Sequence, residues 1–122
     1  MSDTSVDTLL VVCLCAQWCH VCEAYRSSFA QVQANILADY PDTRFAWLDI
    51  EDEADLLEPL DVENFPTILI ATGYTPHFFG VITPQPQTLE RLVRAYMPDA
   101  SAPVLTDVSI IGLLGRIRSQ FG

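Results

Sequence analysis

The sequence predicts a single α/β domain built on a mixed β-sheet with helices on both faces. Its 122 residues are 50% hydrophobic, which is enough to bury one core. Hydrophobic periodicity gives the element order β-α-β-α-β-β-α. A strand–helix–strand start followed by a hairpin and a covering helix is typical of a mixed sheet with two covered faces.

The first half of the chain contains two inner strands and a long helix. Residues 8–15 are an apolar run rich in Val and Leu, as expected of a strand buried on both faces. Residues 20–39 then carry apolar side chains at three- and four-residue steps, which predicts an amphipathic helix. Its expected buried stripe is Cys22, Tyr25, Phe29, Val32 and Ile36. Pro41 ends this helix, and residues 44–50 read as the second strand.

The second half adds a short helix, a hairpin and a covering helix. We expect a short helix over residues 53–60 and a third strand over residues 65–71 that opens with a proline. After a turn, residues 77–82 form the fourth strand, the other arm of a hairpin. Thr83 and Gln85 each precede a proline and are candidate caps of the next helix, with proline at its first position. That helix runs to about residue 97, and its expected buried side chains are Leu89, Leu92, Val93 and Tyr96.

The C-terminal residues form a separate segment. We divide the chain into a domain of residues 1–98 and a segment of residues 99–122, which holds a linker and an amphipathic helix over residues 108–121. The expected apolar face of this helix is Ile110, Ile111, Leu114, Ile117 and Phe121. We expect it to pack on its own domain, with a homodimer contact or a docked partner protein as the alternatives.

Charge and hydropathy exclude several functions. The net charge is −10, and the six basic residues are all arginine, so lysine-dependent Schiff-base and phosphate-loop chemistry is excluded. Nucleic acid is not an expected partner, because its binding needs clustered positive charge. No apolar run approaches the roughly 20 residues of a membrane span. The first strand is preceded by two aspartates and no basic residue, unlike a signal peptide, so we expect a cytoplasmic protein.

All four cysteines lie in one stretch, "VCLCAQWCHVC". In a reducing cytosol, paired cysteines are usually catalytic or metal-binding. Cys19 comes at the expected strand-to-helix junction, where the helix dipole lowers the pKa of a thiol by at most about 1.5 units. Cys22 lies one turn further on and faces the interior, remaining largely a thiol. This asymmetry is typical of an exposed nucleophile, Cys19, with a buried resolving partner, Cys22.

The motif and its position resemble the thioredoxin family. Ala-x-Trp-Cys-x-x-Cys stands at a helix start, and Phe-Pro-Thr opens a strand about 45 residues later. The resemblance covers about residues 8–97. It implies a thioredoxin-like fold with strand order 2-1-3-4, in which Cys19 attacks a protein disulfide and Cys22 resolves the mixed disulfide. It implies no bound cofactor, but an external reductant such as a thioredoxin reductase or glutathione.

The resemblance also assigns residues around the cysteine pair. It implies a cis peptide bond before Pro66, opposite that pair, and a substrate-binding backbone formed by Asn64, Phe65 and Pro66. Trp18 would shield the site. His20 and Val21, the spacer between the two cysteines, would shape it.

The chain departs from the family pattern in three respects. It resembles a minimal core that lacks the family's first strand and helix. Where thioredoxins have a buried acid on the first inner strand, this chain has Cys13, and where they usually have a lysine on the next strand, it has Trp47. The usual proton acceptor for the resolving thiol is therefore missing, and His20 or Glu23 are the candidate substitutes.

Other interpretations of the same residues stay open at this point. Cys13 and Cys15 are expected to be small core residues, with a secondary redox role as the alternative. The four cysteines are also a candidate zinc or iron–sulfur site, although a stiff strand suits wrapping an ion poorly, and we expect no metal. The acidic run over residues 49–63 holds eight of the sixteen acids; it reads as a solvated helix face or as a surface favouring basic partners. A binding or assembly factor with one dedicated client is the alternative function.

Overall fold

The computed structural model describes residues 9–16, 20–52, 55, 66–96 and 104–121 of the chain. Its elements are β1 (Leu9–Cys15), α1 (His20–Asp39), β2 (Arg44–Asp49), β3 (Thr67–Thr72), β4 (Thr75–Val81), α3 (Pro86–Ala95) and α4 (Val108–Phe121). They form a four-stranded sheet of order β2-β1-β3-β4. Strand β1 is parallel to β2 and antiparallel to β3, and β3 is antiparallel to β4. The predicted mixed sheet and its order are confirmed.

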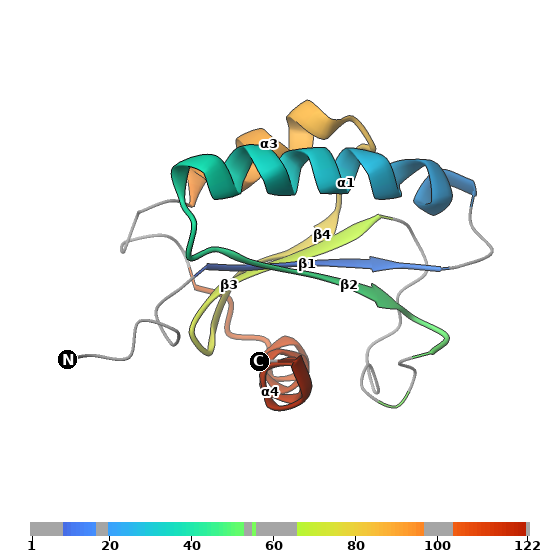
Figure 1. Ribbon diagram of the computed structural model, residues 1–122. Coiled ribbons are helices and arrows are strands. Elements are labelled where there is room, and N and C mark those ends of the chain that lie inside the picture. The colour runs from blue at the N-terminus through green and yellow to red at the C-terminus, as the bar shows by residue number, and fades with distance from the viewer. Residues whose placement is uncertain (1–8, 17–19, 53–54, 56–65, 97–103, 122) are drawn as a thin grey trace.

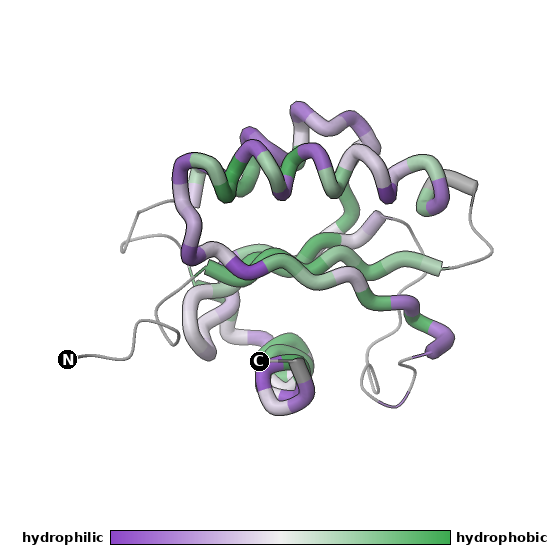
Figure 2. The backbone as a smooth tube through the Cα atoms, in the orientation of Figure 1, coloured by the Kyte–Doolittle hydropathy of each residue, from purple (hydrophilic) through white to green (hydrophobic). Residues whose placement is uncertain are grey.

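Helices cover both faces of this sheet. Helices α1 and α3 lie on one face and α4 lies on the other (Figure 1). Strand β1 is buried along its whole length, and its successive side chains alternate between the two faces. Val11, Cys13 and Cys15 join the core under α1 and α3, whereas Leu10 and Leu14 join the core against α4. Figure 2 shows the resulting apolar character of the strands and of the side of α4 that faces them.

Helix α1 has the bounds and the buried stripe that its periodicity predicts. Cys22, Tyr25, Phe29, Val32 and Ile36 are all buried in the core under α1 and α3. The stripe places Cys22 in the first turn of α1, directly above the central strands. Helix packing on the sheet therefore positions one of the two cysteines of interest.

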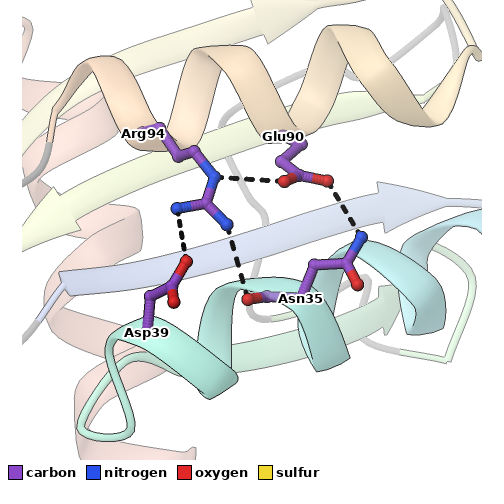
Figure 3. Close-up of polar contacts among 4 residues, drawn as sticks. All are labelled: Asn35, Asp39, Glu90 and Arg94. Atoms are coloured by element: carbon purple, nitrogen blue, oxygen red, sulfur yellow. Dashed lines mark hydrogen bonds and ion pairs between the residues drawn. The ribbon is translucent and has the colours of Figure 1, made fainter.

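Four polar residues join the far end of α1 to α3 (Figure 3). Arg94 of α3 forms an ion pair with Asp39 (Nη1 to Oδ2, 2.9 Å) and another with Glu90 (Nε to Oε2, 3.1 Å). Asn35 donates from Nδ2 to Glu90 Oε1 at 3.0 Å. Hydrogen bonds from Asn35 and Arg94 lower the pKa of the Glu90 carboxyl. These contacts hold the two helices of one face together.

Helix α4 is packed against the second face of the sheet. Asp107 caps its first turn, because Asp107 Oδ1 accepts a hydrogen bond from Ser109 N at 2.8 Å. Arg118 donates from Nε to the carbonyl of Gly73 at 2.7 Å, which ties α4 to the β3–β4 turn. Gly73 has φ 60°, a conformation that glycine adopts without strain.

The buried face of α4 differs from the predicted one. Leu113, Leu114 and Ile117 are fully buried, whereas Ile111 is 42% exposed. The prediction of Ile111 as a core residue is wrong, because α4 turns the row through residues 110, 113, 114 and 117 toward the sheet. Helix α3 begins with Pro86 after Gln85, whose side chain makes no cap hydrogen bond. The predicted short helix over residues 53–60 lies outside the described residues except for Asp55.

The described helices include none that is long and apolar enough to cross a bilayer. The division of the chain at residue 98 stays a prediction.

Candidate functional site

A disulfide joins the end of β1 to the first turn of α1. It links Cys15, the last residue of β1, to Cys22, and the two Cα atoms are 5.7 Å apart. Both cysteines are almost completely buried, at 1% and 2% exposure. The bond forms because β1 directs its odd-numbered side chains toward α1, while the buried stripe of α1 points Cys22 back at the sheet. The structure thus contains a cysteine pair at the predicted strand-to-helix junction.

This bond corrects one part of the sequence interpretation. Cys15 is not a passive core thiol, because it is bonded to the cysteine expected to act as the resolving thiol. Cys22, for the same reason, is not a free thiol in this structure. Cys19 lies outside the described residues, so the predicted pairing of Cys19 with Cys22 stays a prediction. The spacing of the cysteines favours the Cys-x-x-Cys pair. The alternation of side chains along β1, which places Cys15 on the side of α1, is the feature of the sequence that indicates the other pairing.

A third sulfur adjoins this disulfide. Cys13 is a free, fully buried thiol, and its Sγ lies 3.8 Å from the Sγ of Cys15. Burial raises the pKa of the Cys13 thiol to about 12, although the charge of Arg26 acts in the opposite direction. Cys13 therefore stays protonated at neutral pH, where it is a weak nucleophile. The expectation of a buried core thiol at this position is confirmed.

A buried hydroxyl completes the surroundings of the sulfurs. Tyr25 belongs to the same core cluster as Cys13 and Cys22 and is 1% exposed. Burial, and then the neighbouring Cys13, raise the pKa of this hydroxyl. Its oxygen has no hydrogen-bond partner among the residues that the structure describes. The helical stripe predicted the burial of Tyr25 but gave no signal for its unpartnered hydroxyl.

A hollow of about 240 Å³ opens beside Cys22. Its lining residues include Cys22, Glu23, Arg26, Trp47, Asp49 and Asp52. The Cζ of Arg26 lies 4.6 Å from the centre of the Trp47 ring, at the distance of a cation–π contact. Trp47 is the register partner of Cys13 across β1 and β2. One cysteine of the disulfide and a cationic side chain, Arg26, therefore line the same hollow, and the sequence interpretation did not single out Arg26.

The remaining predicted site residues are described only in part. His20 and Val21 begin α1, and Pro66 directly precedes β3. Because Leu14 pairs with Thr67, Pro66 is at the end of the sheet where β1 finishes in Cys15. Trp18, Asn64 and Phe65 lie outside the described residues, and so does the Phe65–Pro66 bond for which a cis geometry is predicted.

The described ranges offer no cluster of side chains suited to bind a metal ion. Those ranges contain no group of three or more His, Cys, Asp or Glu side chains arranged to hold an ion. Cys15 and Cys22 are joined to each other and in this state are not free thiolate ligands. A site that used all four cysteines would need this bond to be reduced first.

A four-stranded sheet of this order, with a cysteine pair where the first inner strand gives way to a helix, defines a thioredoxin-fold domain. The thioredoxin family's sequence model matches residues 3–92. The chain belongs to the thioredoxin family.

Solved structures agree with this fold. The chain is similar to the thioredoxin of Trypanosoma brucei brucei, with 25% identity and a TM-score of 0.60 over 79% of this chain and 80% of that one. It is similar to mitochondrial thioredoxin 3 of Saccharomyces cerevisiae in its oxidised form, with 22% identity and a TM-score of 0.59 over 73% and 79%. Human ERp44 gives 16% identity and a TM-score of 0.67 over 77% of this chain, which spans only 26% of that protein. A search of curated proteins found no match.

Proposed function

We propose that this chain is a thiol–disulfide oxidoreductase in which Cys22 is the buried sulfur of the exchange. The observation that carries the proposal is the disulfide of Cys22, at the junction where the family's redox pair is expected. Cys19 directly precedes α1 in the sequence, and the amino end of a helix favours a thiolate. Cys19 attacks a protein disulfide, and Cys22 then resolves the mixed disulfide.

The bond to Cys15 adds a step before this cycle. The thiolate of Cys19 attacks the sulfur of Cys22, a Cys19–Cys22 bond forms, and Cys15 leaves as a thiolate. This internal exchange conserves electrons and needs no oxidant. A small-molecule thiol such as glutathione, or a thioredoxin reductase, returns the cysteines to the reduced state. We place the cycle in the cytoplasm, with disulfide-containing proteins as substrates.

The same bond favours a second candidate function. While Cys22 is tied to Cys15, a mixed disulfide on Cys19 has no resolving thiol and therefore persists. In that state the protein captures a client rather than reducing it, as a binding or assembly factor would. The two functions differ in the lifetime of the mixed disulfide and in the number of clients.

Single cysteine variants test the proposal. With a disulfide-linked fluorescent peptide as substrate, we expect Cys19→Ser to lower the rate of exchange at least 100-fold. We expect Cys15→Ser to keep or raise the rate, because it removes the competing partner of Cys22. Loss of exchange in Cys15→Ser, with Cys19→Ser unaffected, would show that Cys15 and Cys22 are the working pair and contradict the proposal.

Covalent capture separates the two functions. Cys22→Ser leaves a mixed disulfide on Cys19 unresolved, so captured proteins can be identified by mass spectrometry, with Cys19→Ser/Cys22→Ser as the control. Many captured proteins support a general oxidoreductase, and a single one supports a dedicated binding factor. If nothing is captured, thiol exchange through Cys19 is wrong.

A further inference from the structure

The chain lacks the charged pair that thioredoxins carry behind their cysteines. Cys13 and Trp47 occupy the two positions at which the family resemblance expects an acid and a lysine, and the sheet register places them side by side. Cys13 is a buried neutral thiol. Neither residue supplies a charge to the resolving cysteine, so any charge there must come from another element.

Arg26 is the basic side chain in the lining of the hollow beside Cys22. It follows Cys22 by four residues on α1 and therefore lies on the same side of the helix. Its guanidinium is seated on the ring of Trp47, with Cζ 4.6 Å from the ring centre. Its field also reaches Cys13, whose pKa it lowers against the larger effect of burial.

Arg26 forms no ion pair with the residues that the structure describes. Three carboxylates line the same hollow, those of Glu23, Asp49 and Asp52. One of them is engaged elsewhere, because Asp49 Oδ1 accepts hydrogen bonds from the backbone N of Glu51 at 2.8 Å and of Asp52 at 3.2 Å. The described salt bridges include none from Arg26, which contacts Trp47 instead.

We propose that Arg26, positioned on the Trp47 ring, stabilises the thiolate of Cys22. This inference rests on the proposed function and assigns it a positioning residue. When the Cys19–Cys22 bond of the proposed cycle is reduced, a thiolate of the glutathione class attacks Cys19, a new sulfur–sulfur bond forms there and the electron pair of the old bond passes to Cys22. A leaving thiolate of lower pKa departs faster, and at neutral pH it is then available to attack.

The groups facing Cys22 act in opposite directions. Arg26 lowers the pKa of the Cys22 thiol, whereas the carboxylates of Glu23, Asp49 and Asp52 raise it, and burial under β1 and α1 raises it too. From β1 the groups in the same buried cluster are Cys15 and the protonated Cys13, and from α1 the ionisable group in that cluster is Tyr25. Because Arg26 is exposed to solvent, we expect its charge to lower the pKa of Cys22 by about one unit. This is the lower end of the range for a nearby opposite charge.

Alkylation of the reduced full-length chain measures this contribution. The rate of reaction of each cysteine with iodoacetamide is followed from pH 5 to pH 10, with the modified residue located by fragment mass spectrometry. We expect Arg26→Met, which keeps an apolar stem over Trp47, to raise the apparent pKa of Cys22 by about one unit. Its rate at pH 7 then falls about tenfold. Arg26→Lys should restore the profile, and Arg91→Met, at an exposed site on α3, should leave it unchanged.

The outcomes separate this inference from the proposed function. An unchanged Cys22 profile in Arg26→Met overturns the role of Arg26, and so does a shift that Arg26→Lys fails to restore, because packing rather than charge would then be its cause. A shifted profile in a protein that captures no client supports the role of Arg26 and contradicts thiol exchange through Cys19. An unchanged profile in a protein that still captures clients contradicts the role of Arg26 and supports thiol exchange through Cys19.

Discussion

At the scale of single residues, the environment of each sulfur decides its chemistry. Cys13 and Cys15 are two residues apart on one strand and point to the same side, yet one is a free thiol and the other is in a disulfide. The difference is the partner opposite each of them. Cys22 projects from α1 toward Cys15 and is bonded to it. Cys13 is packed among apolar side chains, where burial keeps it protonated.

The raised pKa of Cys13 predicts a loss of stability in alkaline solution. The folded chain holds this proton up to about pH 12, whereas the unfolded chain releases it near the ordinary value of 9.0. The contribution of Cys13 to the free energy of unfolding is therefore fully present below pH 9 and decreases as the pH rises toward 12. The loss is about 1.4 kcal/mol by pH 10. Urea unfolding of the disulfide-bonded protein at pH 7 and pH 10 measures the loss, and Cys13→Ala should lack it. An equal loss in both proteins would contradict the assignment.

At the scale of elements, α4 covers the face of the sheet that α1 and α3 leave open. Its three fully buried side chains contact residues from the central strands, while its first residue, Val108, is 80% exposed. Asp107 caps its first turn, and near its other end Arg118 bonds to the carbonyl of Gly73 in the β3–β4 turn. The helix is therefore a structural part of the sheet's second layer.

The packing of α4 predicts a clear contrast between two substitutions. Leu114→Ala removes a fully buried side chain and should lower the free energy of unfolding by about 2–5 kcal/mol. Val108→Ala, at the exposed start of the same helix, should change it by no more than about 0.5 kcal/mol. Urea unfolding of both variants at pH 7 measures the two changes. Similar small effects for the two variants would mean that α4 is not packed on the sheet in solution.

The elements that the structure describes were predictable from the sequence, whereas the sulfur bonding was not. A period of 3.6 in α1 and continuous apolar character in β1 reflect burial, which local patterns record directly. The bond between Cys15 and Cys22 depends on how far α1 is rotated over the end of β1, and no local pattern records that angle. Ile111 was mispredicted for a similar reason, because α4 offers two adjacent apolar rows and only its docking on the sheet selects one.

At the scale of the whole molecule, the disulfide acts chiefly on the unfolded chain. Its two cysteines are seven residues apart in sequence, and closing a loop of that length restricts the unfolded ensemble by about 2 kcal/mol. We expect reduction to lower the free energy of unfolding of the wild-type protein by about this amount. The variant Cys15→Ala/Cys22→Ala, measured with and without reductant, should show no such change. A wild-type protein equally stable in both conditions would contradict a closed Cys15–Cys22 bond in solution.

The place of α4 in the chain also affects how the protein is made. A ribosome releases the chain from its N-terminus, so all four strands are synthesised, up to Val81, before α4 begins at Val108. Until Leu113, Leu114 and Ile117 have been synthesised, one apolar face of the sheet lacks the cover that α4 gives it. The nascent domain therefore passes through a stage at which the apolar side chains that α4 covers are exposed, and such surface is prone to aggregation.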